Sequence, residues 1–274
     1  MNVEKEKQVF RLFRGRLAQY KVWKDDASSW EARWIKRPLA SLLEEHANGE
    51  LEEFEIFTRY LPQHKPVLEA GCGLGQIVMA LSARGYQVEG VDYCEPTIKR
   101  IQAAAPQLNV RVGDVYNLNV PDGTYGGYIS LGVFEHNPEG PQAGLSEVKR
   151  VLAADGVAFI TVPYLNPKRQ SLISHSPLAA STTLPGNLTF YQYYFARQEF
   201  EFYLKEAGLG VVEVFPYAIY AGLTRDFAIG RWLNKRNFFT WQIHHRITRR
   251  CREANNWARW RWAHMLMFVC KPTS

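Results

Sequence analysis

The sequence predicts an α/β fold in which a mostly parallel sheet is flanked by helices. Between about residues 64 and 162, short apolar runs alternate with helical stretches, which is typical of repeated β-α-β units. One apolar run ends at three glycines spaced by single residues, and a helical stretch follows at once. A chain of 274 residues with 46% hydrophobic and 22% charged residues is long enough for one large domain with an appendage.

Five strands are expected in the first part of this region, with helices in the gaps. The expected strands lie near residues 66–70, 86–91, 109–112, 126–131 and 156–162. The expected helices cover about residues 75–84, 95–104 and 142–153. Gly85 suits a helix C-cap, and Pro106 cannot continue the helix before it.

A polar, Tyr-rich connection over residues 163–195 follows the fifth expected strand. A helix is expected over residues 197–207, ending at Gly208. Two further strands are expected, at residues 211–215 and 265–270. The segment between these last two strands is far longer than an ordinary connection.

The first part of the chain is expected to be an amphipathic helical extension covering residues 1–60. Ser28 followed three residues later by Glu31 is typical of a helix start. Three tryptophans fall in this extension: Trp23, Trp30 and Trp34. The main domain is expected over residues 61–274, with a basic helical insert at about residues 225–262.

The net charge of +6 is concentrated in that insert, which we call the basic segment. Residues 225–262 hold ten Lys or Arg and two acids, so they carry +8, whereas the rest of the chain carries −2. Basic residues interleaved with tryptophans are typical of a helix in an anionic membrane interface. Two other interpretations stay open: a helical cap packed on the protein's own core, and contact with nucleic acid.

Neither an export signal nor a membrane span is expected from the sequence. Its first residues are charged rather than apolar, and no run approaches the roughly 18 apolar residues of a membrane span. The four cysteines show no C-x-x-C pairing, which argues against a zinc site and a disulfide framework. A cytoplasmic protein is the expectation, and peripheral membrane association is the interpretation left open by the basic segment.

Gly71, Gly73 and Gly75 close the first expected strand. Glycine allows positive φ and lets a ligand approach the backbone with no Cβ in the way. The amides that open the following helix suit an anion. Such a turn, at the carboxyl end of a parallel strand, is where open α/β sheets bind nucleotide-like ligands. A structural turn without a ligand is the alternative for this motif alone.

Two acids end the next two expected strands. Asp92 lies 21 residues after Gly71, the spacing at which an acid takes the hydroxyls of a ribose. Asp114 follows the third strand, where it can accept from an adenine amino group. For both acids a structural helix N-cap is the alternative.

A nicotinamide or flavin dehydrogenase is the main competing class on such a fold. Its G-x-G-x-x-G/A motif is not satisfied: counted from Gly71 the sixth position is Gln76, and counted from Gly73 it is Val78. Side chains of this size obstruct close packing of the helix on the strand. The sequence therefore argues against a dehydrogenase.

In order and spacing, the motifs resemble those of class I S-adenosylmethionine-dependent methyltransferases, most closely the small-molecule type of ubiquinone and menaquinone biosynthesis. LEAGCGLG, VEGVDYCEPTI, VGDV and ISLGVFEH match four successive motifs of that family, and EVKRVLAADGVAFITVPY resembles the helix, turn and fifth strand that follow. The likeness covers about residues 67–162 and continues weakly to about 214. It implies a Rossmann-like sheet of seven strands in the order 3-2-1-4-5-7-6, with the seventh antiparallel.

The resemblance also implies S-adenosyl-L-methionine as cofactor and a role for individual residues. The glycine turn would approach the methionine moiety, Asp92 would bind the ribose hydroxyls, and Asp114 would hold the adenine amino group. The full set of implied cofactor contacts is Glu69, Gly71, Gly73, Gly75, Asp92, Tyr93, Asp114, Val115, Ser130 and Leu131. No metal is expected.

His136 is the candidate general base, since it follows the fourth strand and a hydroxyl acceptor must lose its proton. Glu135 is its companion. A wall or hydrogen-bonding role is the alternative for His136. Tyr164, Tyr193 and Tyr194 are the candidate substrate contacts, with ordinary aromatic packing as the alternative.

The expected function is methyl transfer to a small or lipid-linked metabolite, most readily at oxygen. One alternative is an inactive methyltransferase-like scaffold, against which the intact glycine turn and Asp92 weigh. Another is an RNA-directed methyltransferase that uses the basic segment. ISLGVFEH stands where base-directed enzymes carry an Asn/Asp-Pro-Pro-Tyr type signature, so a nucleic-acid partner is not favoured.

Overall fold

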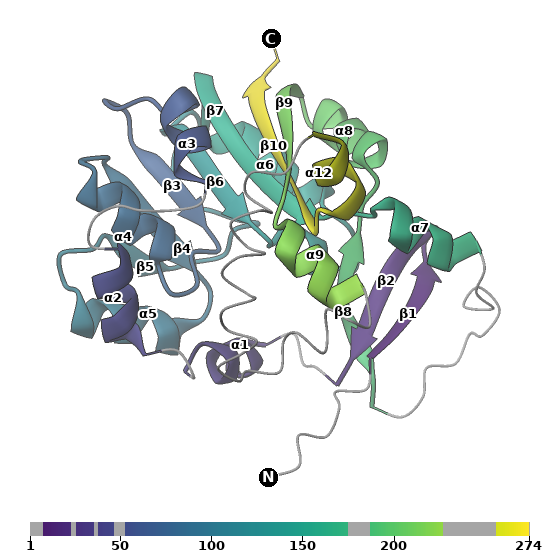
Figure 1. Cartoon of the computed structure of the whole chain (residues 1–274). Helices are drawn as coiled ribbons and strands as arrows, with labels where there is room; N and C mark the ends of the chain where they lie inside the picture. The colour runs from purple at the N-terminus through teal and green to yellow at the C-terminus, as the bar shows by residue number, and fades with distance from the viewer. Residues whose placement is uncertain are drawn as a thin grey trace.

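The computed structural model describes residues 8–22, 26–35, 38–46, 53–174, 187–226 and 256–273. Figure 1 shows two sheets, a large one flanked by helices and a small one beside it. The seven strands of the large sheet are β3 (Val67–Ala70), β4 (Val88–Asp92), β5 (Val110–Val112), β6 (Tyr125–Leu131), β7 (Leu152–Pro163), β9 (Leu209–Tyr217) and β10 (Met265–Pro272).

The strand order of the large sheet is β5-β4-β3-β6-β7-β10-β9, which confirms the predicted order 3-2-1-4-5-7-6. The pairs β3–β4, β3–β6, β4–β5 and β6–β7 are parallel. β10 is antiparallel to both β7 and β9, so the last strand reverses direction as predicted. The parallel strands therefore end at one common edge.

The helices that follow the parallel strands also agree with the prediction to within a few residues. They are α4 (Gln76–Ala83), α5 (Glu95–Ala104), α6 (Gln142–Val151) and α8 (Arg197–Glu206). The remaining helices are α1 (Ala27–Trp34), α2 (Leu39–His46), α3 (Phe54–Tyr60), η1 (Phe134–His136), α7 (Pro167–Ser174), α9 (Ile219–Asp226) and α12 (Asn256–Trp262).

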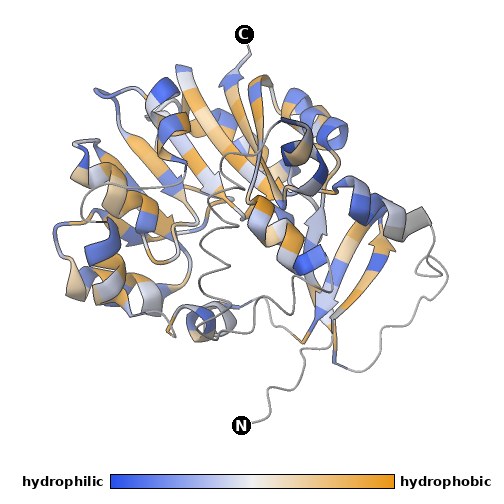
Figure 2. Cartoon of the chain, in the orientation of Figure 1, coloured by the Kyte–Doolittle hydropathy of each residue, from blue (hydrophilic) through white to orange (hydrophobic). Residues whose placement is uncertain are grey.

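The core lies on both faces of the large sheet. Figure 2 shows its strands as mostly hydrophobic. All four residues of β3 are buried, as expected for a central parallel strand covered by helices on both sides. On one face Phe159 of β7 packs edge-on against Phe57 of α3, with ring centroids 5.0 Å apart. Fully burying such a side chain stabilises a fold by about 1.5–3 kcal/mol.

The helical prediction for residues 1–60 is wrong for its first part. β1 (Gln8–Phe13) and β2 (Arg16–Lys21) form an antiparallel hairpin, and β2 pairs with β8 (Thr189–Tyr194) in the small sheet. Arg14 and Gly15 both have positive φ, 50° and 78°, as a tight two-residue hairpin turn requires. Among the described residues of this range, the helical pattern holds for α1, α2 and α3 alone. The domain division at residue 60 stays a prediction.

Residues 163–195 also contain more regular structure than predicted, because α7 and β8 lie within them. Most of the basic segment, residues 227–255, lies outside the described residues. Trp232, Phe238, Phe239 and Trp241 fall there. None of the helices that the structure describes is both long and apolar enough to cross a membrane.

Candidate active site

A cavity of about 1320 Å³ opens where the parallel strands end. Its walls come from the turns after β3, β4, β5 and β6, and from α1, β8 and α9. This edge is where open α/β sheets bind ligands. Pockets for one drug-sized ligand span about 300–1,000 Å³, so the cavity has room for a cofactor together with a second molecule.

The glycine turn forms the floor of one end. Gly71, Gly73 and Gly75 all have positive φ, at 80°, 51° and 70°. A Cβ on Gly71 would lie 2.5 Å from Cγ2 of Val133, and one on Gly73 would lie 3.1 Å from the Trp34 ring. Only glycine satisfies both the backbone angles and the close approach at Gly71.

Asp92 lies beside that turn. One carboxylate oxygen accepts from the amide of Gly73 at 2.8 Å, and the other accepts from the amide of Cys94 at 2.9 Å. Burial raises the pKa of Asp92, although these backbone hydrogen bonds favour the charged form. Asp92 thus orders the turn and also lines the cavity, where its oxygens have further lone pairs for a ligand.

Glu69 is buried beneath the turn. Its Oε2 accepts from the amide of Val78 at 3.0 Å, which ties the end of β3 to α4. Burial, together with the neighbouring Asp92, holds the pKa of Glu69 well above its ordinary value. A buried carboxyl in this state favours a positively charged neighbour.

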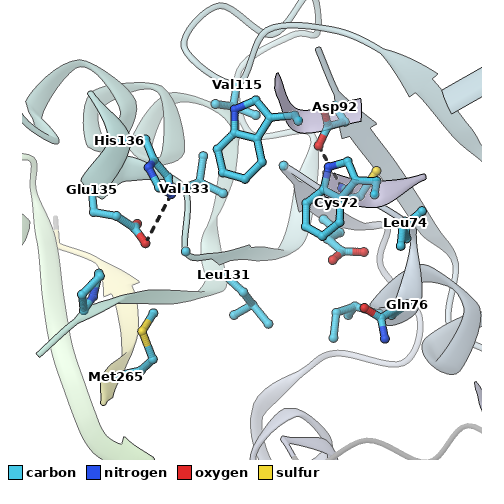
Figure 3. Close-up of a pocket in the computed structure, with 18 of the residues that line it drawn as sticks. Cys72, Leu74, Gln76, Asp92, Val115, Leu131, Val133, Glu135, His136 and Met265 are labelled. Atoms are coloured by element: carbon cyan, nitrogen blue, oxygen red, sulfur yellow. Dashed lines mark hydrogen bonds and ion pairs between the residues drawn. The ribbon is translucent and has the colours of Figure 1, made fainter. Parts of the chain in front are cut away.

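Glu135 and His136 lie across the cavity from Asp92 (Figure 3). Glu135 Oε1 is 3.9 Å from His136 Nε2. Burial raises the pKa of Glu135 to about 8 and lowers that of His136 to about 4. Among the described residues, Glu135 Oε2 has no hydrogen-bond partner. Both side chains are therefore neutral at pH 7.

The tautomer of His136 follows from its partner. Nδ1 lies 2.6 Å from the backbone carbonyl oxygen of Tyr191, and a carbonyl only accepts. Nδ1 therefore carries the proton of the neutral ring, and Nε2 keeps a lone pair. The ring packs edge-on against Trp30 and Tyr191, with centroids 5.0 and 4.8 Å away.

Ten of the sequence-predicted site residues line the cavity. These are Glu69, Gly71, Gly73, Asp92, Tyr93, Asp114, Val115, Leu131, Glu135 and His136. Two predicted cofactor contacts do not. Gly75 instead opens α4 in a left-handed conformation. Ser130 is fully buried within β6, because successive side chains of a strand point to opposite faces and Leu131 takes the cavity side.

The three predicted substrate tyrosines are absent from the cavity lining, and their role as substrate contacts stays a prediction. The Tyr193 hydroxyl donates to the carbonyl of Pro138 at 2.7 Å, and its ring stacks on Phe13. The Tyr194 hydroxyl donates to Gln19 Oε1 at 3.0 Å. Tyr164 packs edge-on against Trp260. Aromatic packing, the alternative interpretation, is what these three side chains do.

Tyr191 and Gln192 line the cavity in their place. Tyr20 pairs with Phe190 and Gln19 with Gln192, so Tyr191 is the extra residue of a β-bulge. A bulge bends its strand and redirects a side chain, and bulges are common beside functional sites. The sequence carried no signal for this displacement, because the register depends on the distant β2.

Among the residues of the lining that the sequence prediction did not name are Arg33, Arg225 and His264. The sequence marks Arg225 only as the first residue of the basic segment. These residues come from α1, α9 and the residue before β10. Nothing in the local pattern groups such distant positions.

The comparisons with known proteins point to one class. Residues 68–160 match the family model of a methyltransferase domain. Over 99 residues the chain is 33% identical to a probable S-adenosylmethionine-dependent methyltransferase of Mycolicibacterium smegmatis. That match covers 36% of this chain and 38% of the relative, so the chain spans well under half the relative's length.

Solved structures share the fold at low sequence identity. One chain of the complex between the Haloferax volcanii Trm112 methyltransferase activator and a putative methyltransferase is 18% identical. The TM-score is 0.55, covering 92% of this chain and 100% of that chain. A SAM-dependent methyltransferase of Methanosarcina mazei is 17% identical, with a TM-score of 0.54, covering 80% of this chain and 98% of that one.

The seven-stranded sheet and the cavity at its edge define a class I methyltransferase fold. Within it, the chain carries a methyltransferase domain of the S-adenosylmethionine-dependent class. The family implies S-adenosyl-L-methionine as the cofactor. The narrower resemblance to the enzymes of ubiquinone and menaquinone biosynthesis stays a prediction.

The residues present fit that cofactor. The close approach at Gly71 leaves the turn bare of side chains, and the buried carboxyls of Glu69, Asp92 and Glu135 line the same cavity. S-adenosylmethionine carries an ammonium and a sulfonium, and positive groups favour the charged form of such carboxyls. The orphaned Oε2 of Glu135 is a further acceptor for a ligand.

Proposed function

We propose that the protein transfers a methyl group from S-adenosylmethionine to an oxygen of a small-molecule acceptor. One observation carries the proposal. A single cavity joins the glycine turn and Asp92 to an imidazole whose unprotonated nitrogen, Nε2 of His136, faces a buried carboxyl. The scaffold and RNA-directed alternatives have no comparable support among the described residues.

The cofactor, when bound, supplies a methyl group on a sulfonium that is already activated for in-line displacement. The chain's part is to bind and orient. Gly71 and Gly73 let a ligand approach the backbone, and Asp92, which accepts from the amide of Gly73, is proposed to accept from ribose hydroxyls as well. Holding two reactants in line contributes most of the acceleration that such a transfer needs.

His136 is proposed to take the proton of the acceptor hydroxyl at Nε2. Its low pKa in the buried site makes it a weak base unless a negative charge lies nearby. Glu135, 3.9 Å from Nε2, supplies that charge once a cation in the cavity favours its ionised form. General-base assistance of this kind is worth roughly 10²–10⁴-fold in rate.

A lipid-linked acceptor, reached through peripheral contact with an anionic membrane, is the second part of the proposal. Its support is the composition of the basic segment and the exposure of Trp257, which is 63% accessible on α12. Flotation with phosphatidylglycerol vesicles and neutral phosphatidylcholine vesicles tests it. Failure to float with the anionic vesicles rules the membrane contact out.

Calorimetric titration with S-adenosylmethionine and S-adenosylhomocysteine tests the cofactor assignment. Micromolar binding that Asp92→Ala abolishes is the expected result. Lys99→Gln, which changes an exposed side chain paired with Glu95 on α5, is the control and leaves binding unchanged. Absence of binding to both ligands contradicts the proposal.

A further inference from the structure

The lining of the cavity holds charged groups of both signs. The acids Glu69 and Asp92 lie at the glycine turn, where a cationic methyl donor is favoured. Arg33 and Arg225 also line the cavity, and His264 contacts Arg225. These two arginines are available to a second molecule in the cavity.

Arg225 lacks an acidic partner within the described part of the chain. Its Nη1 contacts Nε2 of His264, and no carboxylate lies within 4 Å of its guanidinium there. The adjacent Asp226 is already bonded, because Oδ1 accepts from Arg169 at 3.0 Å and Oδ2 accepts from Asn166 at 2.8 Å.

His264 cannot accept a hydrogen bond from Arg169 and from Arg225 at the same time. Its Nδ1 contacts Arg169 while its Nε2 contacts Arg225. Burial and these two guanidinium groups hold the pKa of His264 well below its ordinary value, and a neutral imidazole accepts at only one nitrogen. Arg169 has other acceptors, including the carbonyl of Tyr164 at 2.5 Å. Arg225 therefore retains most of its donors for a ligand.

A second arginine converges on the same region from α1. Arg33 Nη1 donates to the hydroxyl of Tyr191 at 2.8 Å. Arg33 and Arg225 both favour the ionised form of that phenol, although burial raises its pKa overall. Tyr191 is also the residue that holds His136 through its carbonyl. The positive charges thus gather next to the proposed base.

We propose that the methyl acceptor is an anion whose carboxylate or phosphate group is held by Arg225, with Arg33 and Tyr191 beside it. This inference rests on the proposed methyl transfer, since it assigns the substrate class of the same cavity. The planar guanidinium fork matches both oxyanions in two-point geometry. A neutral acceptor would leave the donors of Arg225, an exposed side chain that lines the cavity, without a charged acceptor.

Matched probes test the proposal on the full chain saturated with S-adenosylhomocysteine. Benzoate, phenyl phosphate, the neutral benzamide and inorganic phosphate are titrated in turn by calorimetry. We expect the two organic anions to bind at least about tenfold more tightly than benzamide, the usual worth of a hydrogen bond to a charged group. Arg225→Gln removes this preference, and Arg225→Lys keeps part of it.

Arg59→Gln is the matched control, because Arg59 is exposed and lies 3.6 Å from Glu213 outside the cavity. It keeps the preference for anions. The inference is overturned if benzamide binds as well as benzoate, if no organic probe binds, or if Arg225→Gln retains the preference. Inorganic phosphate binding as tightly as phenyl phosphate would indicate a free-ion site and also overturn it.

Binding of S-adenosylhomocysteine distinguishes failure of the anionic-acceptor proposal from failure of the proposed methyl transfer. A wild-type protein that binds it and does not distinguish the probes refutes the anionic acceptor alone. A wild-type protein that does not bind it refutes the proposed function itself. Arg225→Gln with unchanged affinity for S-adenosylhomocysteine is folded, so its loss of anion binding is then a local effect.

Discussion

The imidazole of His136 donates from Nδ1 to the backbone carbonyl of Tyr191, across 2.6 Å. The two residues come from parts of the chain next to different sheets. His136 follows β6 of the large sheet, whereas Tyr191 lies in β8 of the small one. A main-chain oxygen thus sets which imidazole nitrogen faces the cavity. The small sheet, with its N-terminal hairpin, is in this way part of the site.

His136→Ala tests the base. Removing Nε2 leaves the acceptor hydroxyl without a proton acceptor, so we expect turnover to fall by about 10²-fold while the affinity for S-adenosylmethionine changes little. Single-turnover kinetics and calorimetry measure the two quantities separately. His64→Ala, a change at an exposed loop residue, is the control. Turnover retained in His136→Ala would remove the residue from the mechanism.

Glu135 is expected to make the folded protein less stable as the pH rises above 6.5. It keeps its proton up to about pH 8 in the folded state, whereas its ordinary pKa is 4.5. Between these values the folded state binds the extra proton, so the free energy of unfolding falls with rising pH. His136 acts in the opposite direction only between about pH 4 and 6.5.

From pH 6.5 to 8, Glu135 alone should cost about 2 kcal/mol, and Glu135→Gln should abolish that loss. Urea unfolding at four pH values in this window measures it. Glu95→Gln is the control, because Lys99 lowers the pKa of that exposed carboxyl and its charge is constant throughout the window. An unchanged slope in Glu135→Gln would show that the carboxyl is already ionised.

Gly71→Ala tests the glycine turn. The substitution strains a backbone at φ 80° and sets a methyl 2.5 Å from Val133, so it should destabilise the fold by about 2–4 kcal/mol and weaken cofactor binding more than tenfold. Gly85→Ala is a matched control, with φ 83° and nothing within 4 Å of the new methyl.

Gly85→Ala should show the backbone strain alone, about 1–2 kcal/mol, with cofactor affinity intact. Thermal unfolding and titration with S-adenosylhomocysteine measure both effects in both variants. Equal losses of stability and affinity in the two variants would mean that the close approach at Gly71 has no special role.

Tyr191→Phe tests whether Tyr191, which lines the cavity, contributes to binding of the acceptor. The change removes the acceptor of the Arg33 hydrogen bond and leaves the main-chain carbonyl that holds His136. We expect the KM for the acceptor to rise severalfold with kcat nearly unchanged. Tyr193→Phe, which loses a hydrogen bond to Pro138, should instead cost about 1 kcal/mol of stability and leave KM unaltered. The reverse pattern would support the original substrate prediction.

The parallel sheet and the part of the cavity at the glycine turn were predictable because their signals are local. A buried strand, a glycine turn and an acid at the next strand's end each lie within a short stretch of sequence. Parallel strands bring their carboxyl ends to one edge, so Gly71, Asp92 and Glu135 meet in any such sheet. Ser130 does not line the cavity, because its side chain points to the opposite face of β6 from that of Leu131, an alternation that the motif does not reveal.

The residues proposed to face the methyl acceptor could not be predicted, because their positions depend on pairing between segments that are distant in the sequence. Lys21 of β2 pairs with Thr189 of β8, and the bulge in that pairing turns Tyr191 into the cavity. Arg33 and Arg225 reach the same place from helices that are almost two hundred residues apart in the chain. By itself the sequence predicted the parallel sheet and residues that line the cavity at its glycine turn, whereas the strand order came from the family resemblance. Only the tertiary structure decided which side chains face the acceptor, because register and helix placement follow from contacts with no local signature.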